Sequence, residues 1–195
     1  MNKTIDYYNK HTKEFIESTQ SVDFTNTQNR FLSYLPANAS ILDFGCGSGR
    51  DTKYFLEKKY QVTAIDGSKR ICEEASKYTG INVKQMYFEE LNDQNRYDGI
   101  WACASILHLP KNELYLLFKK MYIALKENGI IYTSFKYGDF HGERNGRYFS
   151  DFTEDSFKEF LYQIPEFQIM ELWITTDVRE GRGEQKWLNI LIHKA

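Results

Sequence analysis

The stretch ILDFGCGSGRDTKYF, residues 41–55, constrains the fold of this 195-residue chain more than any other feature. Its apolar start predicts a buried strand, and Gly45, Gly47 and Gly49 then follow at alternate positions. Glycine has no Cβ, so the chain can turn sharply and bring main-chain N–H groups close to a ligand. In an open parallel sheet, such a ligand lies in the crevice at the carboxyl ends of the strands. We therefore expect a ligand site immediately after this strand.

Short apolar segments alternate with helical patterns through the middle of the chain. The segments that predict strands are residues 40–44, 61–66, 82–88, 97–104 and 129–135. The clearest helical pattern begins at Pro110, carries apolar residues at three- and four-residue steps, and ends at Gly129. Strands that alternate with helices of this length indicate parallel βαβ units, with helices on both faces of the sheet.

The length favours a single domain, residues 1–195, with three parts. Residues 1–35 predict two helices, residues 36–135 form the ligand-binding core, and residues 136–195 complete the sheet and cover the site. The first helix carries Phe15 and Ile16, and the second carries Phe31, Leu32 and Leu35.

The last part of the chain predicts a loop, a helix and two strands. Residues 136–152 are rich in glycine and charge, which is typical of a loop, and Thr153 can cap the helix that follows. Residues 167–178 and 184–194 predict two strands that form an antiparallel hairpin at the edge of the sheet.

The composition excludes several classes of function. With 25 basic and 27 acidic side chains the net charge is -2, which argues against a nucleic-acid or membrane-surface binder. No apolar run approaches the roughly 18 residues of a membrane span, and the N-terminus lacks the apolar core of a signal peptide. Cys46, Cys72 and Cys103 have no metal-ligand spacing, so we expect reduced thiols, a cytoplasmic location and no bound metal.

Asp66 gives the glycine motif an acidic partner. It ends the second predicted strand about 20 residues after the glycines, where a carboxylate can accept hydrogen bonds from both ribose hydroxyls. The pair predicts a cofactor that contains a nucleoside. A dinucleotide would require G-x-G-x-x-G, but Arg50 stands at the third glycine position, so a dinucleotide is disfavoured.

Four blocks of the sequence resemble the class I S-adenosylmethionine-dependent methyltransferases. They are LDFGCGSGRDT, VTAIDGS, YDGIWACASILHLP and LKENGIIYTSF, and they follow one another in the family's order between residues 41 and 135. The resemblance implies a Rossmann-like, mostly parallel seven-stranded sheet whose last strand is antiparallel, with an N-terminal helical lid. It also implies S-adenosyl-L-methionine as the cofactor.

By position, the resemblance implies a role for each motif residue in binding the cofactor. The three glycines would line its methionine part, Asp66 would hold the ribose, and Asp43 would orient the loop and the amino group. The full set of residues expected at the cofactor is Asp43, Gly45, Cys46, Gly47, Gly49, Asp66, Gly67, Ser68, Phe88, Glu89, Ala102, Tyr7 and Tyr8.

Two of these contacts involve the main chain. Tyr87 stands where many members of the family carry an acid for the adenine, so Phe88 would offer its backbone N–H there, with Glu89 nearby. The carbonyl oxygen of Ala102, at the end of the fourth strand, would accept from the amino group of the cofactor.

Three side chains are candidates for a general base: His108, His141 and Tyr8. His108 could instead cap the helix that follows it. The first helix, with Tyr7 and Tyr8, would close over the cofactor, or would simply pack its tyrosines on the sheet. Cys46 is expected to pack between glycines and not to act as a nucleophile, and Trp101 is expected in the core.

Two loops concentrate basic residues over the predicted site. Lys136, Tyr137, Arg144 and Arg147 lie in the first loop with His141, and Arg179 and Arg182 lie between the final strands. The planar fork of arginine matches phosphate and carboxylate, so we expect an anion site for the methyl acceptor.

These features predict a methyltransferase that acts on a small, anionic acceptor. The C-terminal blocks are also similar to bacterial enzymes of capsule biosynthesis that methylate phosphoramidate groups, which suggests O-methylation of a phosphate, phosphoramidate or carboxylate. Two alternatives remain open: methylation of a neutral metabolite, and a module that binds S-adenosylmethionine without catalysis. The sequence identifies neither the acceptor nor the oligomeric state.

Overall fold

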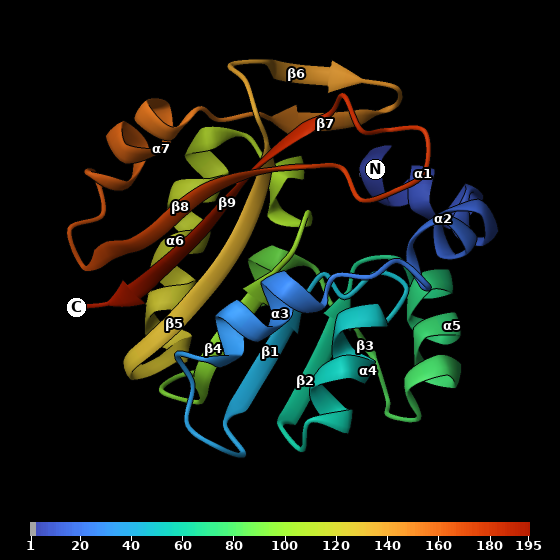
Figure 1. The fold of residues 1–195 in the computed structure, drawn as a ribbon, viewed down its shortest axis with the longest axis horizontal. Helices are drawn as coiled ribbons and strands as arrows, with labels where there is room; N and C mark the ends of the chain where they lie inside the picture. Colours follow the sequence, from blue (N-terminus) through green and yellow to red (C-terminus); the bar gives the residue numbers. More distant parts are fainter. Residues whose placement is uncertain (1–2) are drawn as a thin grey trace.

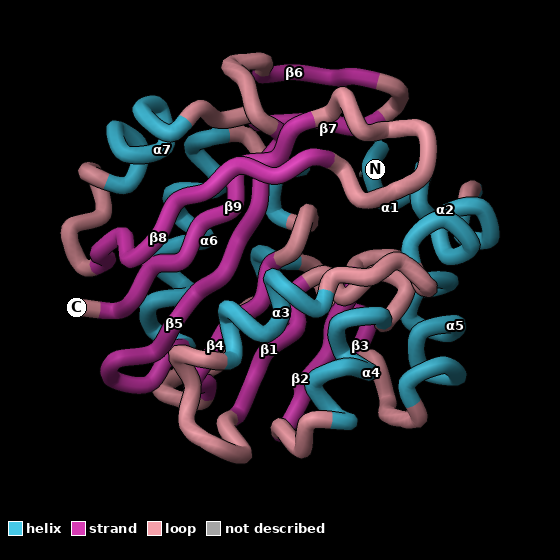
Figure 2. Tube along the Cα trace, in the orientation of Figure 1, coloured by secondary structure: helices cyan, strands magenta, loops and turns pink. Residues whose placement is uncertain are grey.

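The structure, a computed structural model, describes residues 3–195 as an α/β fold (Figures 1 and 2). Its α-helices are α1 (Lys3–Lys10), α2 (Thr12–Thr19), α3 (Thr25–Leu32), α4 (Arg50–Glu57), α5 (Lys69–Thr79), α6 (Lys111–Ala124) and α7 (Glu154–Leu161). Two short 3₁₀ helices are η1 (Phe88–Glu90) and η2 (Ile106–His108). The strands are β1 (Ser40–Phe44), β2 (Gln61–Asp66), β3 (Lys84–Gln85), β4 (Tyr97–Ala102), β5 (Leu125–Lys136), β6 (His141–Arg144), β7 (Arg147–Ser150), β8 (Phe167–Thr176) and β9 (Lys186–Lys194).

Seven strands form one sheet in the order β3-β2-β1-β4-β5-β9-β8. The first five pair in parallel, whereas β9 runs antiparallel to both β5 and β8. This arrangement confirms the predicted seven-stranded sheet with an antiparallel last strand. It also confirms the β8–β9 hairpin at the sheet edge. The carboxyl ends of the parallel strands point toward the β6–β7 hairpin, α1 and α2 (Figure 1).

Alternate residues of the central strands pack into two cores. Ile41 and Trp101 lie on the face covered by α3 and α4, where Trp101 is fully buried and stacks on Tyr132 at 4.0 Å. Leu42 and Ile100 point to the opposite face, which α6 and α7 cover. Side chains alternate along a strand, so the central strands are apolar on both faces and helices cover both sides, as predicted.

The N-terminal part differs from the prediction of two helices. The segment expected as the first helix is divided into α1 and α2 at His11, which has φ −110° and ψ 25°. His11 Nδ1 lies 2.9 Å from the carbonyl oxygen of Tyr7, and the Thr12 hydroxyl donates to that of Tyr8 at 2.7 Å. Side chains that bond to nearby carbonyl groups compete with the helical pattern, which accounts for the break.

Two boundaries in the core also differ from the sequence prediction. The strand expected over 82–88 is limited to β3, because Glu90 accepts the Tyr87 N–H at 2.7 Å and starts the turn of η1. The helix after Pro110 ends at Ala124, not at Gly129. Leu125 is extended, fully buried and paired with Tyr97, so burial in the sheet ends the helix early.

The segment predicted as a loop, residues 136–152, contains a β-hairpin instead. Strands β6 and β7 pair in antiparallel fashion, and Asn145 (φ 53°) and Gly146 (φ 74°) form the turn. Asn-Gly with both residues left-handed is the favoured two-residue hairpin turn, so the Asn145-Gly146 pair is itself a sequence signal for this hairpin. The cap of α7 is as predicted: the Thr153 side chain accepts from the Ser156 N–H.

Within the described range, no helix combines the length and apolarity needed to cross a membrane.

Candidate functional site

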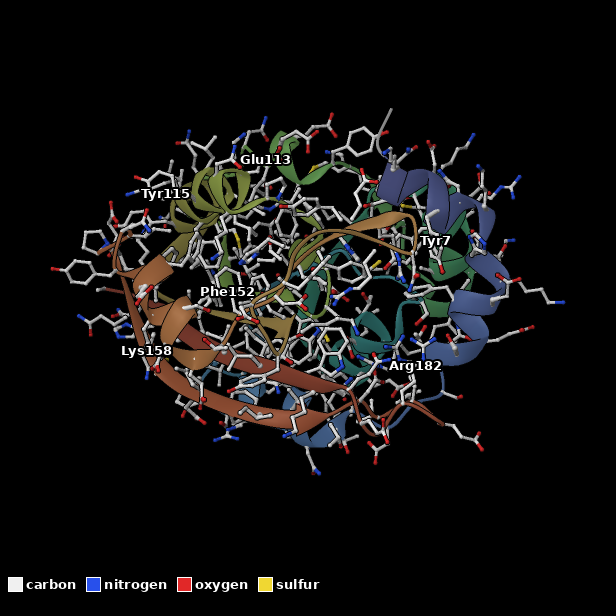
Figure 3. The ribbon with its side chains drawn as sticks, turned by 90° about the horizontal axis from the view of Figure 1, so that it is seen from above. Tyr7, Glu113, Tyr115, Phe152, Lys158 and Arg182 are labelled. Atoms are coloured by element: carbon white, nitrogen blue, oxygen red, sulfur yellow. The ribbon has the colours of Figure 1, made fainter. Side chains whose placement is uncertain are left out.

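A pocket of about 670 Å³ lies over the carboxyl ends of the parallel strands. The turn after β1, the end of β2 and the residues after β4 form its floor, while α1, α2, the β6–β7 hairpin and the β8–β9 loop form its walls. In Figure 3, which views the molecule from above, Tyr7 and Arg182 lie toward one end of the molecule, and Tyr115 and Lys158 lie toward the other. Volumes of about 300–1,000 Å³ are usual for ligand sites.

Two of the three motif glycines form the cradle of the pocket. Gly45 has φ +85°, and a Cβ placed there would lie 2.5 Å from the Ser105 Cβ. Gly47 has φ +54°, and its Cβ would lie 3.1 Å from the ring of Phe15. Both positions therefore require glycine for conformation and for space.

Gly49 has a structural role at the start of α4. It caps the start of α4, and a Cβ there would meet Thr79 of α5 at 2.7 Å, so this glycine lets two helices pack closely. It does not belong to the pocket lining among the described residues, contrary to the expected cofactor contact.

Asp66 lies at the end of β2, in the pocket floor. Its carboxylate accepts main-chain N–H groups from Gly47 at 3.1 Å and Ser68 at 2.9 Å, so it links the turn after β1 to the turn after β2. Burial raises its pKa to about 6, against the lowering effect of these bonds. The carboxylate is thus partly desolvated and ready to accept donors from a ligand.

We expect the affinity for a ribose-containing cofactor to depend on the ionisation of Asp66. Hydroxyl donors prefer the carboxylate, so below pH 6, where the group is protonated, affinity should fall by up to about tenfold per pH unit. Calorimetric titration between pH 5 and 8 measures this change. Asp66→Asn should bind weakly at every pH and remove this pH dependence, whereas an unchanged pH profile in the variant would assign the titration to another group.

Asp43 lies beneath the glycine turn and outside the pocket lining. It accepts the Thr52 hydroxyl at 2.5 Å, and burial, with the nearby Asp51, raises its pKa to about 8. Asp43 therefore supports the turn from below. The expected contact with the amino group of the cofactor is not placed by this geometry.

Arg50 was weighed in the sequence only as a departure from the dinucleotide motif, yet it lines the pocket. Its guanidinium donates to both carboxylate oxygens of Asp51, at 2.8 and 2.9 Å. Asp51 also accepts from Gln28 at 2.6 Å and from the Trp101 indole at 2.9 Å. This buried network fixes the start of α4 beside the glycine turn, and nothing in the local sequence pattern indicated it.

Most of the other predicted cofactor residues line the pocket, and one lies behind its lining. Gly67, Phe88 and Glu89 line the pocket together with Tyr87. Ser68 is buried behind the wall, where it caps α5 by accepting the Ile71 N–H. Cys46 lines the pocket, but burial raises the pKa of its thiol well above the usual value, which favours packing over nucleophilic chemistry.

Ala102 does not reach the pocket. It is fully buried, and its carbonyl oxygen accepts the Thr133 hydroxyl at 3.3 Å. The chain lines the pocket one residue later, through Cys103, Ala104 and Ser105. The chain turns into the pocket only after Ala102, because β4 ends there and Ala104 adopts a left-handed φ of 49°. The expected contact of the Ala102 carbonyl with the amino group stays a prediction.

Helices α1 and α2 close one side of the pocket. The Ser68 hydroxyl donates to Asn9 Oδ1 at 2.7 Å, and Gln20 Nε2 donates to the Ser48 carbonyl at 3.2 Å. Tyr8 lines the pocket, whereas Tyr7 lies outside its lining, stacked on His11 at 4.3 Å. The helical lid is therefore present, and of the two tyrosines Tyr8 faces the ligand space.

Four of the predicted basic residues differ in whether an acidic side chain balances their charge. Arg144 donates to both oxygens of Asp151 at 2.8 and 2.9 Å, and Arg179 forms a close ion pair with Asp177. Neither acid was predicted from the sequence, because the folded hairpins determine which arginine each acid lies beside. Lys136 and Arg147, in contrast, have no carboxylate partner among the ion pairs of residues 3–195.

Lys136 and Arg147 lie in the pocket lining as incompletely satisfied cations. Lys136 Nζ donates to the neutral Gln185 at 2.6 Å, and its pKa is lowered by burial and by nearby Arg144 and Arg179. The Arg147 guanidinium lies 4.3 Å from the ring of Tyr7, and its buried Nε has no hydrogen-bond partner within the described part of the chain. Arg182 and Tyr137 also line this side. Such a wall favours an anion.

Of the candidate bases, only Tyr8 and His108 face each other in the pocket. Tyr8 Oη lies 3.0 Å from His108 Nε2, and Arg147 Nη1 donates to Tyr8 Oη at 3.3 Å. His108 does not cap α6, whose N-cap is Pro110, so that interpretation was wrong. His141 is exposed on β6 and outside the pocket lining.

Across residues 3–195, no group of three or more His, Cys, Asp or Glu side chains is arranged to hold a metal ion.

The chain is similar to known methyltransferases in sequence and in fold. Residues 41–129 match the family model described as a methyltransferase domain. A putative methyltransferase, YqeM of Bacillus subtilis, is 28% identical over 113 residues, which are 52% of this chain and 46% of that protein. The chain spans less than half the length of the curated relatives that it matches.

Two solved structures show the same fold at low sequence identity. One is 1,6-didemethyltoxoflavin-N1-methyltransferase of Burkholderia thailandensis, bound to 1,6-didemethyltoxoflavin and S-adenosylhomocysteine: TM-score 0.77, 21% identity, 98% of this chain and 85% of that chain. The other is the [4+2]-cyclase SpnF: TM-score 0.69, 15% identity, 87% of this chain and 80% of that chain.

Proposed function

We propose that this chain, whose fold is that of the class I methyltransferases and whose residues 41–129 match a methyltransferase domain, binds S-adenosyl-L-methionine and methylates a small anionic acceptor. The cofactor assignment rests on the cradle formed by Gly45 and Gly47, where a Cβ would meet Ser105 or Phe15 in the pocket lining, with Asp66 as the acceptor beside it.

The residues present fit this cofactor. Main-chain groups after β1 can approach its methionine part, Asp66 can accept from its ribose, and Tyr87 with Phe88 borders the space for its adenine. When bound, S-adenosylmethionine supplies a methyl group already activated by a sulfonium. The task left to the protein is to hold both partners in line and exclude water, and α1 and α2 wall the pocket for this purpose.

Fold alone does not establish methyl transfer, because SpnF has this fold and is described as a [4+2]-cyclase. A module that binds the cofactor without transferring its methyl group is therefore the alternative that the experiment must separate. The acceptor wall favours catalysis, since a module that only bound the cofactor would need no second set of cations in the same pocket.

Lys136 and Arg147 carry the proposal that the acceptor is anionic. Their pocket side also contains Arg144 and Arg179, whose charges Asp151 and Asp177 already balance. A phosphate, phosphoramidate or carboxylate would pair with Lys136 and Arg147 and would satisfy the buried Arg147 Nε. We therefore assign the proposed anion site mainly to Lys136 and Arg147.

We expect Arg147→Lys to impair methylation of an anionic acceptor while sparing the cofactor. Lysine keeps the charge but loses the planar fork, so kcat/KM should fall roughly ten- to a hundredfold. Transfer of labelled methyl can be measured with phosphorylated and dephosphorylated pairs, such as phosphoserine and serine or glucose 6-phosphate and glucose, and with hydroxy acids. The effect of Arg179→Lys should be smaller, since Asp177 already occupies that guanidinium.

The matched control is Arg96→Lys, which changes an arginine that pairs with Asp93 outside the pocket lining. Preference for a neutral acceptor over its anionic counterpart, or indifference to Arg147→Lys, would contradict the anion site. Cofactor binding without transfer to any acceptor would favour the non-catalytic alternative.

A further inference from the structure

His108 has a defined tautomer in this pocket. Its Nδ1 lies 2.7 Å from the carbonyl oxygen of Tyr148, which can only accept, so Nδ1 carries the hydrogen. In the neutral ring Nε2 is then an acceptor, and the atom 3.0 Å from it is Tyr8 Oη. The Tyr8 hydroxyl therefore donates to His108, and its oxygen keeps lone pairs that can accept from another donor.

Burial, and after it the cations around His108, keep the ring neutral. The cations come from several elements packed against it: Arg147 of β7, Lys136 of β5 and Arg144 of β6, with Tyr8 of α1 facing Nε2. Burial and then these cations lower the pKa of His108 to about 4, while its bond to the Tyr148 carbonyl opposes them. At neutral pH, Nε2 is thus free of a proton and is already bonded to Tyr8.

Tyr8 connects this pair to both ends of the pocket. On one side its ring lies 5.1 Å from that of Phe15, whose ring carbons would contact a Cβ at Gly47. On the other side its hydroxyl accepts from Arg147. Tyr8 therefore stands between the glycine cradle and the cations of the acceptor wall, where a reacting atom would meet the methyl group.

We propose that Tyr8 and His108 act together as the proton acceptor for methyl transfer, and that the acceptor presents an O–H or N–H group to Tyr8 and its anionic group to Arg147. This inference rests on the proposed function and narrows its acceptor class: the methylated atom is not itself the anionic oxygen. A compound with a hydroxyl or amine a short distance from a phosphate or carboxylate fits both contacts.

The proton transfer balances without another reactant. As the acceptor oxygen or nitrogen bonds to the methyl carbon, the carbon–sulfur bond breaks and its electron pair stays on sulfur. The acceptor's proton passes to Tyr8 Oη while the proton of Tyr8 moves to His108 Nε2, and the resulting imidazolium later releases it to water. General base catalysis of this kind contributes about a hundred- to ten-thousandfold in rate.

The anionic group of the acceptor also strengthens this base. An anion on Arg147 would offset one of the cations that, after burial, lower the pKa of His108, so this pKa should rise when the correct acceptor is bound. A neutral compound would leave His108 a weak base. Recognition of the charge and activation of the base are thus coupled through Arg147.

Nuclear magnetic resonance on histidine-labelled protein, loaded with S-adenosylhomocysteine, tests this pair without any acceptor. We expect His108 to have hydrogen on Nδ1 and none on Nε2, and inorganic phosphate, used as the anion probe, to raise its pKa by about one unit or more. Arg147→Gln should raise that pKa by itself and abolish the phosphate effect, whereas Arg96→Gln, outside the pocket lining, should change neither.

The rate of methyl transfer provides the second readout. It is measured with whichever of the phosphorylated compounds or hydroxy acids proves to be an acceptor. Tyr8→Phe and His108→Gln should each lower kcat by roughly a hundredfold or more and keep the affinity for S-adenosylhomocysteine. Hydrogen on Nε2, a His108 titration indifferent to phosphate, or wild-type turnover in either variant would overturn the inference. Loss of S-adenosylhomocysteine binding by the unmodified chain would instead refute the proposed function.

Discussion

Gly45→Ala should abolish cofactor binding while leaving a folded protein. Its Cβ would lie 2.5 Å from the Ser105 Cβ and inside the cradle, so the turn must shift away from the ligand. Losing main-chain contacts there weakens affinity by roughly a hundredfold or more, which corresponds to about 3 kcal/mol. Calorimetry with S-adenosylhomocysteine measures the loss, and circular dichroism reports the fold.

Gly80→Ala is the matched control for this variant. Gly80 has φ +79°, close to the +85° of Gly45, but a Cβ there meets no atom within 4 Å. Both substitutions place an alanine in left-handed backbone, which costs about 1–2 kcal/mol. Only Gly45→Ala adds the close approach to Ser105. Equal affinity in the two variants would show that the cradle does not contact the cofactor.

Removal of residues 1–20 should also eliminate cofactor binding. This deletion takes away α1 and α2, and with them Tyr8, Phe15 and the bond from Ser68 to Asn9. The sheet and its two cores are built from later residues, so the truncated chain should retain cooperative thermal unfolding. Unchanged affinity for S-adenosylhomocysteine would mean that these helices only cover the pocket from outside.

The strands and the cofactor end of the site could be predicted from sequence because their signals are local. Apolar runs at 40–44 and 61–66 coincide with β1 and β2, and Gly45 and Asp66 each end or follow their own strand. Parallel strands bring their carboxyl ends to one edge, so the two residues meet without any further information.

The acceptor end could not be predicted in the same way, because its pairings depend on tertiary structure. Whether Arg179 is free depends on where Asp177 lies after the β8–β9 hairpin forms. The contact of Tyr8 with His108 joins residues 100 positions apart. The positions of the basic residues in two loops predicted a basic wall but gave no sign of which charges the acids balance.

Helix boundaries were harder for a related reason. Burial of Leu125 beside Tyr97 ends α6, although residues up to 128 continue the helical spacing. Packing into the sheet offers more apolar burial than another helical turn does, and this preference exists only once the sheet is formed. The missed Asn145-Gly146 turn, in contrast, was readable from sequence alone.

The most direct test of the central claim is a calorimetric titration of the 195-residue chain with S-adenosylhomocysteine, in parallel with NAD. If Gly45, Gly47 and Asp66 form the site described above, one equivalent of S-adenosylhomocysteine should bind to wild type, and Gly45→Ala should remove that binding. NAD should not bind, since Arg50 occupies the third glycine position of the dinucleotide motif. Binding of NAD without binding of S-adenosylhomocysteine would contradict the account.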